Sequence, residues 1–265
     1  MKKQLRLFLT LSTLTYASEL DLGLGMGNLY YPDYLGSNHT NNLVIPFPFI
    51  KYHNEKLNID NDGIRQQLFS IDKLSVRLSM SGSLPVESSG AREGMDDLDP
   101  AGEIGSALVY TLYNDSAFNL TLNLPIRAVV STDFEGIDYR GYLYEFKAEM
   151  EYESEEGYLF QLHTGGVWAD ERYNNYLYGV DQERVTPSRE SYRAEAGYGG
   201  YKSSFGISKK FKKVWTGLFV RHYDLTNSSF SESPLKERNS AIYGGLFISY
   251  LFDKSFSDKI KEWVE

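Results

Sequence analysis

The sequence predicts an all-β protein that crosses a membrane as one antiparallel β-barrel, and three observations predict it. The chain opens with an export signal, hydrophobic and polar residues then alternate along segments of mostly ten or more residues, and no run of 18 apolar residues follows the signal. A bilayer-spanning chain must satisfy its backbone polar groups in helices or in a closed barrel. Because the sequence has no apolar segment long enough for a spanning helix after the signal, a closed barrel is the structure that we expect.

The first seventeen residues have the pattern of a cleavable signal peptide. Lys2, Lys3 and Arg6 make a basic start, residues 7–14 are mostly apolar, and Ala17 ends a small-x-small cleavage site. A short amphipathic N-terminal helix is the alternative interpretation. We expect export through the inner membrane, with the mature protein starting at position 18.

Composition narrows the function classes. The 265 residues suffice for one large domain, and the 21 tyrosines suit a membrane interface, where a ring lies in lipid and its hydroxyl in water. The formal charge of −9 repels phosphate backbones, so we expect no nucleic-acid partner. The chain has no cysteine, which excludes a disulfide framework and a thiolate metal site.

Period-two alternation is clearest in residues 20–27, 74–81, 118–127 and 242–252. A soluble β-sandwich alternates as well. Two features favour a barrel with an apolar outside: the segments exceed the usual five or six residues of soluble strands, and the polar face is rich in Gly, Ser, Asn and charges that suit a wet lumen.

We expect about twelve strands within residues 18–252, an even number as in bacterial barrels. The expected strands are 19–28, 42–52, 55–61, 64–71, 73–82, 102–113, 116–129, 138–152, 157–169, 191–210, 213–224 and 240–252. The two short strands on either side of Asp62 can also be read as one bent strand, and ten strands is the alternative count.

The connections give a second indication of a membrane barrel. The long ones, 29–41, 83–101, 130–137, 170–190 and 225–239, alternate with short ones, as extracellular loops alternate with periplasmic turns. Residues 253–265 depart from the strand pattern. Their apolar residues share a helical face, so this tail is either a short periplasmic amphipathic helix or a frayed end.

The motif Tyr31-Pro32-Asp33-Tyr34-Leu35-Gly36-Ser37 resembles the MipA/OmpV family of outer-membrane proteins, named for the MltA-interacting protein. In that family a glycine-alternating first strand leads into this motif, and an apolar, proline-containing strand follows it. Further matches occur in order along nearly the whole mature chain, at Val44–Phe49, Met95–Asp99, Glu103–Gly105, Tyr178–Val180, Tyr192–Ala194, Trp215, Tyr223–Leu225, Ser233–Leu235 and Ser249–Phe252.

The resemblance implies a non-enzymatic protein of the bacterial outer membrane without a cofactor. It implies contact with outer-membrane lipid and lipopolysaccharide, and a scaffold that links a lytic transglycosylase to a bifunctional murein (peptidoglycan) synthase. Other members of the family are described as osmoregulated proteins or adhesins. A small-solute channel and a surface adhesin are therefore the alternatives to the scaffold.

Charged residues fall on the predicted lumen faces. They form either a charge-selective pore or a plug of salt-linked side chains, and the narrow interior of a twelve-stranded barrel favours the plug. The candidates are Arg77, Arg127, Arg193, Arg221, Glu103, Glu145, Glu149 and Glu195.

Other groups with potential chemistry have plainer interpretations. A barrel lipase would need one of the four histidines, His39, His53, His163 or His222, beside a serine at the rim, and we expect no catalytic residue.

The acidic cluster of Glu93, Asp96, Asp97 and Asp99 lacks the EF-hand spacing for Ca²⁺, so we expect a solvated loop and no metal. The aromatic loop entry of Tyr30, Tyr31, Pro32 and Tyr34 suits an interfacial girdle and a turn, with a surface-binding platform as the alternative.

Overall fold

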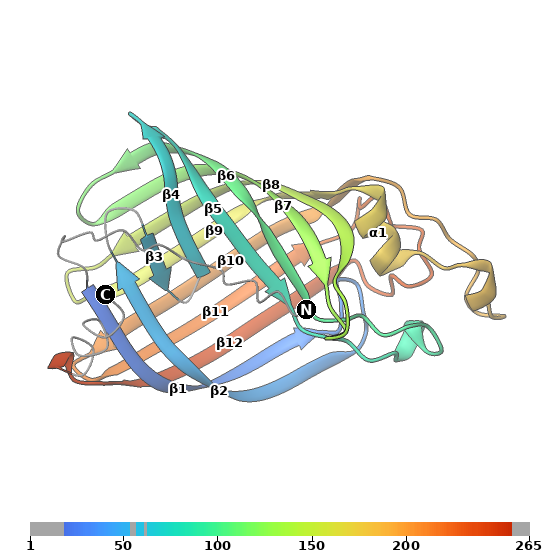
Figure 1. Cartoon of the computed structure of the whole chain (residues 1–265), viewed down its shortest axis with the longest axis horizontal. Coiled ribbons are helices and arrows are strands. Elements are labelled where there is room, and N and C mark those ends of the chain that lie inside the picture. Colours follow the sequence, from blue (N-terminus) through green and yellow to red (C-terminus); the bar gives the residue numbers. More distant parts are fainter. Residues whose placement is uncertain (1–18, 54–56, 61–62, 256–265) are drawn as a thin grey trace, which may run out of the picture.

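A computed structural model describes residues 19–53, 57–60 and 63–255 of the chain. These residues form twelve β-strands, one α-helix and two short 3-10 helices (Figure 1). The strands are β1 (Glu19–Pro32), β2 (Thr40–His53), β3 (Leu57–Asp60), β4 (Gly63–Ile71), β5 (Leu74–Ser83), β6 (Ala101–Asn114), β7 (Phe118–Ser131), β8 (Asp138–Glu153), β9 (Tyr158–Ala169), β10 (Gly197–Phe211), β11 (Val214–Asp224) and β12 (Ser240–Leu251). The helices are α1 (Glu171–Tyr178), η1 (Gly90–Arg92) and η2 (Gln182–Arg184).

The strands form one antiparallel barrel, which confirms the predicted fold class. Each strand pairs with its neighbours in sequence, and β1 closes the ring by pairing with β12. The ring is thinnest at β3, where only two residue pairs, Tyr52 with Ile59 and His53 with Asn58, join it to β2. Among the described residues, no helix is long and apolar enough to span a membrane.

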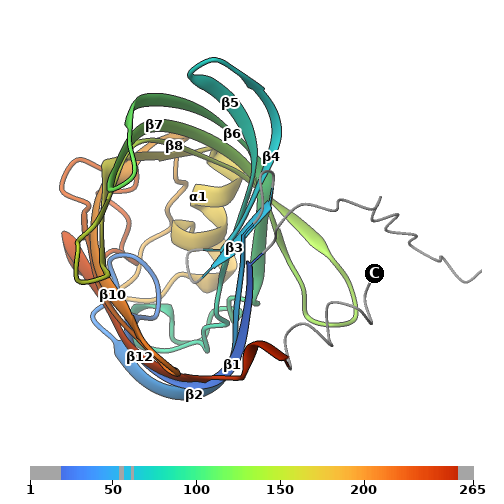
Figure 2. The same cartoon turned by 90° about the vertical axis from the view of Figure 1, so that its left-hand side faces the viewer.

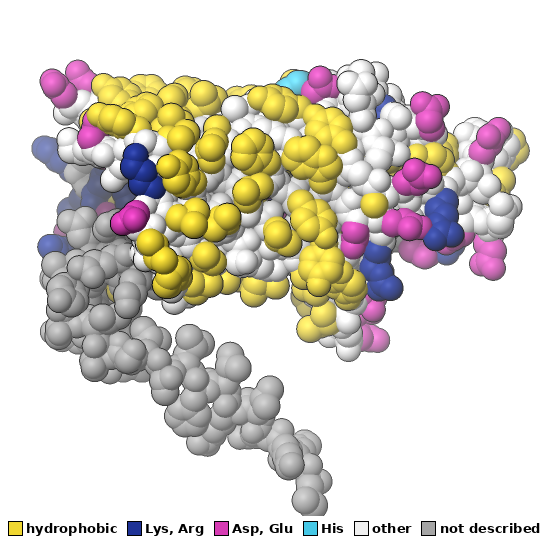
Figure 3. Space-filling model, turned by 90° about the horizontal axis from the view of Figure 1, so that it is seen from above, with side chains coloured by type: hydrophobic (Ala, Val, Ile, Leu, Met, Phe, Trp, Pro, Cys, Tyr) yellow, Lys and Arg dark blue, Asp and Glu magenta, His cyan; other side chains and the backbone are white. Residues whose placement is uncertain are grey.

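The two faces of the strands differ as the alternation predicts. Ile126 points outward and is 52% exposed, whereas its neighbour Arg127 points inward and is 6% exposed. Figure 3 shows hydrophobic side chains spread over the middle of the barrel, with charged side chains gathered at its two ends. Such an exposed apolar belt is stable only against lipid.

Glycines on the inner face of the barrel make room for aromatic rings. A Cβ atom added at Gly25 would lie 2.6 Å from the Phe47 ring, and one at Gly27 would lie 2.7 Å from the Phe247 ring. Each ring therefore lies over a glycine of a neighbouring strand, which explains the alternating glycines of β1. The paired residues are Gly23 with Phe49, Gly25 with Phe47, Gly27 and Gly217 with Phe247, and Gly245 with Phe219.

The connections separate into two ends. The long loops, including the one that carries α1, gather at the right-hand end of Figure 1, which we call the long-loop end. The short turns lie at the opposite, short-turn end, as do the start of β1 and the end of β12, since Gly23 pairs with Leu251. This is the alternation expected from the sequence.

The structure differs from the sequence prediction in two places and decides between its two strand counts. The tenth strand starts at Gly197 rather than at residue 191, because the preceding segment packs with the loops. The loop after β9 contains the unexpected helix α1, whose first turn is capped by the Asp170 carboxylate accepting from the Tyr173 backbone N–H at 2.9 Å. The segment around Asp62 forms two strands, so the count is twelve rather than ten. The signal peptide 1–17 and residues 256–265 of the predicted tail lie outside the described residues.

The glycine–aromatic packing gives a test. Gly25→Ala should destabilise the barrel by about 1–3 kcal/mol, because the new methyl group collides with Phe47 and with the Ile248 carbonyl oxygen, 2.8 Å away. Gly102→Ala is the matched control, since nothing lies within 4 Å of its added Cβ. Urea unfolding in lipid vesicles, followed by tryptophan fluorescence, measures both variants. Equal midpoints for the two would contradict the packing role of Gly25.

Candidate functional site

Four long loops meet over one end of the barrel and form a structure that we call the cap, made of residues 33–39, 84–100, 170–196 and 225–239. Its centre is a cluster of buried side chains contributed by every one of these loops. The cluster consists of Tyr34, Leu98, Tyr178, Ala194, Leu225 and Phe230, with Leu35, Val86, Tyr176, Leu177, Tyr192 and Tyr223 packed against it.

Tyr178, at the end of α1, is the central residue of the cap and is 1% exposed. Its ring stacks on Phe230 with 3.6 Å between centroids and meets the Tyr34 ring edge-on at 6.3 Å. Its hydroxyl donates to the Leu35 carbonyl at 3.0 Å, and its own carbonyl accepts from the Ser233 hydroxyl at 2.7 Å. Burial raises the pKa of the Tyr178 and Tyr34 phenols, so both stay neutral hydrogen-bond donors.

The motif that carries the family resemblance forms part of this cap. The Tyr34 hydroxyl donates to the Leu235 carbonyl at 2.7 Å. Gly36 has a φ of +93°, and its carbonyl accepts the backbone N–H groups of Glu237 at 2.8 Å and Arg238 at 2.9 Å. The left-handed conformation explains why glycine stands there. Burial of Tyr34 shows that its interpretation as a girdle residue is wrong, whereas Tyr30 points outward and is 43% exposed.

The remaining motif residues bind neighbouring loop atoms. The Asp33 carboxylate accepts from Asn41 at 2.6 Å and from the Ser89 hydroxyl at 3.0 Å, which joins two loops. The Ser37 hydroxyl accepts the His39 backbone N–H at 3.0 Å. Tyr31 and Pro32 end β1 beside the start of β2. The geometry gives this motif a structural role in closing the cap.

Two arginines tie the cap together through backbone carbonyls. Arg92 is 4% exposed and donates to the Leu177 carbonyl at 2.9 Å and to the Asp96 carbonyl at 3.0 Å. Arg189 donates to the carbonyls of Ala91 and Glu93, both at 2.9 Å. Burial lowers the pKa of Arg92, although the group still carries its charge at neutral pH.

The cap reaches into the barrel through α1. Figure 2, a view from the short-turn end, shows α1 within the outline of the ring of strands. Tyr173 of α1 packs against Val129, Leu143 and Ala169 of the inner wall, and burial raises the pKa of its phenol. The cap therefore covers the long-loop end with packed side chains rather than leaving an open mouth.

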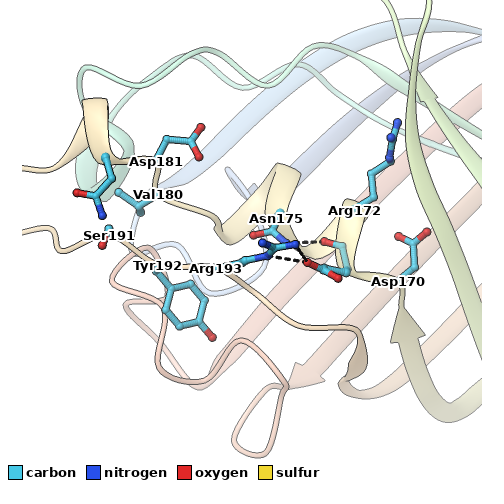
Figure 4. A pocket seen from close by; sticks show the side chains of 10 residues that line it. Asp170, Arg172, Asn175, Val180, Asp181, Ser191, Tyr192 and Arg193 are labelled. Carbon is cyan, nitrogen blue, oxygen red and sulfur yellow. Dashed lines mark hydrogen bonds and ion pairs between the residues drawn. The ribbon is translucent and has the colours of Figure 1, made fainter.

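The outer side of the cap carries an open hollow of about 770 Å³ beside α1 (Figure 4). Arg193 pairs there with Glu171 at 2.5 Å, and the Arg193 side chain is 83% exposed. The Glu195 backbone carbonyl accepts from Asn174 at 2.7 Å. Arg193 and Glu195 were predicted to face the lumen, and this is wrong because both precede β10 and belong to the cap loop.

Below the cap the barrel encloses a cavity of about 680 Å³. One part of its wall is a network of buried charges centred on Glu145, which is 6% exposed and pairs with Arg127 and with Lys202. Arg127 also pairs with Glu103 at 2.7 Å. Lys147 pairs with Glu149 at 2.8 Å, and Glu149 accepts from Asn123. Arg77 and Arg221 line the same cavity.

The facing wall of the cavity is aromatic. It comes from β2, β11 and β12, whose inward residues there are Phe47, Trp215, Phe219 and Phe247. The cavity is therefore amphipathic, with charge on one side and rings on the other. Sequence reasoning missed this division, although the aromatic residues opposite the glycines of β1 carry its signal.

The other candidate residues do not converge on one site. His163 lines the cavity, His39 lies beside Gly90 in the cap and His222 points outward; the side chain of His53 lies outside the described part. The carboxylates of the acidic loop point to separate partners, with Asp96 paired to Arg184, Asp97 accepting the Ser88 backbone N–H and Asp99 paired to Arg140. Within residues 19–53, 57–60 and 63–255, no group of three or more acidic, histidine or cysteine side chains is placed to hold a metal ion.

The charge network predicts a large effect of one isosteric substitution. Glu145→Gln removes the carboxylate shared by Arg127 and Lys202. Because both cations then lack this partner in the wall, the free energy of unfolding should fall by about 3 kcal/mol. Asp138→Asn, at an ion pair whose carboxylate is 71% exposed, should cost less than about 1 kcal/mol. Thermal unfolding in detergent compares the two, and equally small losses would show that the network adds no stability.

The chain matches the family described as "MltA-interacting protein MipA" over residues 24–252. A search of curated proteins gives no match. Among solved structures, it is similar to the NanC porin, with 9% identity, a TM-score of 0.41 and coverage of 86% of this chain and 98% of that one. It is also similar to the outer-membrane protease OmpT from Escherichia coli, with 12% identity, a TM-score of 0.29 and coverage of 89% and 96%.

These structural similarities are too low to carry an argument about function. The family match spans nearly the whole described barrel, including the loops of the cap. The chain thus belongs to the MltA-interacting protein MipA family and is an outer-membrane β-barrel.

Proposed function

We propose that this protein is a scaffold in the outer membrane that holds a lytic transglycosylase, and with it a murein synthase, near the peptidoglycan. The observation that carries the proposal is the packed cap. A diffusion pore needs a continuous water path, and the cap packs the stacked rings of Tyr178 and Phe230 over one end of the barrel. The name of the family, which describes interaction with a transglycosylase, supports the choice of partner.

The surface available to such a partner is the short-turn end, which faces the periplasm in barrels of this kind. Its described turns include residues 154–157, with the exposed Glu155 and Glu156, and the exposed Lys212 of the β10–β11 turn. The tail 253–265 is a second candidate contact. A small-solute channel is the second candidate function, and the amphipathic cavity inside the barrel favours it.

Conductance in planar bilayers separates these two functions. We expect the wild-type protein to give no unit steps, because the cap closes the extracellular end. The double variant Tyr178→Ala/Phe230→Ala removes the stacked pair and should give measurable steps if the cap is the barrier. Clear steps from the wild type, equal to those from the double variant, would favour the channel over the scaffold.

Capture of the partner tests the scaffold itself. In cross-linked envelopes, the wild-type protein should co-purify with a lytic transglycosylase. Charge reversal of Glu155 and Glu156 to Lys, or deletion of 253–265, should lower the captured amount severalfold if that surface is the contact. The matched control is reversal of Asp133 and Glu135, two exposed carboxylates of an extracellular loop, which should change nothing. No capture by the wild type would refute the scaffold.

A further inference from the structure

On one side of the barrel, two edges of the described strands have no paired neighbour. No strand formed by the described residues pairs with residues 40–51 of β2 on the side away from β1, or with residues 78–83 of β5 on the side away from β6. Figure 1 looks onto this side, where β9 to β12 of the far wall are visible between β2 and β5. We call the space between these two free edges the lateral opening.

The cavity borders both free edges of the lateral opening. Its lining includes Ile50 of β2 and Met80 of β5, whose side chains point outward and are 42% and 41% exposed. It also includes the inward neighbours Phe47 and Ser79. Residues of both edges thus border the same cavity.

The free edge of β2 is unsuited to pairing with another strand. Strand β2 contains Pro46 and Pro48, and neither residue has a backbone N–H to donate. Proline is confined to sheet edges because a paired strand would lose a hydrogen bond at each one. These residues therefore favour a non-peptide occupant of the opening, and an apolar chain from the surrounding lipid meets this requirement.

An aromatic track runs from the lateral opening into the cavity. Phe47, on the free-edged strand β2, meets the Phe247 ring edge-on with 5.5 Å between centroids, and Phe247 stacks with Phe219 at 6.1 Å. The Arg221 guanidinium lies 5.8 Å from the Phe219 centroid. Three rings thus form a row from strand β2, which borders the opening, to one cation.

The far end of this track favours an anion. Arg221 has no carboxylate within ion-pair distance among the described residues, and its Nε is buried without a hydrogen-bond partner. The cavity lining holds six cationic side chains, Lys51, Arg77, Arg127, Lys147, Lys202 and Arg221, against two carboxylates, Glu145 and Glu149. Even with Glu103, which pairs with Arg127, the cavity is cationic, although the chain as a whole carries −9.

We propose that the cavity binds a single-chain anionic amphiphile of the fatty-acid type, which enters from the membrane through the lateral opening. Its hydrocarbon chain lies on Phe47, Phe247 and Phe219, and its carboxylate pairs with Arg221. A cavity of about 680 Å³ falls within the range of about 300–1,000 Å³ of small-molecule sites. This proposal concerns the lumen and is independent of the scaffold, whose contacts lie at the periplasmic end.

Quenching of Trp215, which lines the cavity, tests the binding. In a Trp168→Phe/Trp263→Phe background, Trp215 is the one remaining tryptophan of the chain. With the protein in phosphatidylcholine vesicles, dibromostearate should quench Trp215 saturably. A brominated alkyltrimethylammonium of equal chain length, which partitions into the same bilayer, should quench it weakly. Equal quenching by the two probes would overturn the proposal, because it would show no preference for an anion.

Two substitutions test the role of Arg221. Arg221→Gln should weaken dibromostearate binding about tenfold, as expected for the loss of one charge-assisted hydrogen bond. Arg221→Lys keeps the charge and should bind within about threefold of the wild type. Both variants should show the heat-modifiable gel migration of the folded barrel. Unchanged affinity in folded Arg221→Gln would remove Arg221 from the site and refute the proposed pose.

A third measurement tests the route of entry. Because the chain has no cysteine, Met80→Cys and Leu24→Cys can each be labelled with one bulky maleimide. Met80 borders the lateral opening, whereas Leu24 faces lipid in the paired wall between β2 and β12. The label at position 80 should slow quenching of Trp215 severalfold, and the label at position 24 should leave the rate unchanged. Equal rates would exclude entry through the opening.

Discussion

The structure depends on one constraint: inside a bilayer, every backbone N–H and C=O must find a partner within the protein. The closed ring of antiparallel strands meets this constraint almost everywhere. The exception is the stretch between β2 and β5, where β3, with four residues, and β4 complete the ring and only two residue pairs join β3 to β2. Two prolines reduce the number of unpaired donors on the β2 edge. The place where the barrel is least complete is thus also the place where its sequence is adapted to an unpaired edge.

The interior is built by two different kinds of packing. On one side, aromatic rings lie over glycines of adjacent strands, so the inner wall is apolar and tightly filled near β1 and β12. On the other side, carboxylates and cations neutralise one another around Glu145, at a cost of desolvation that only good geometry repays. Because the two sides meet in one cavity, the lumen combines features of a lipid-binding pocket and of a charged plug.

The cap and the barrel have separate roles in this arrangement. The cap joins loops that are far apart in sequence through buried rings and backbone carbonyls, and it covers the long-loop end. Of the stretches that carry the family resemblance, some, such as Met95–Asp99, lie in these loops, and others, such as Val44–Phe49, lie in strands.

The sequence by itself determined the class of fold, the number of strands and the inward or outward direction of most side chains, because period-two alternation is a local property that survives in any sheet. Arg127 and Glu145, for example, fall on the inner face by alternation alone. Tertiary structure decided the rest. The contact of Tyr34 with Leu235 spans 201 positions of the chain, and no local pattern encodes it. The position of Arg193 could not be predicted from the alternation of polar and apolar residues either, because it depends on a loop that folds over α1.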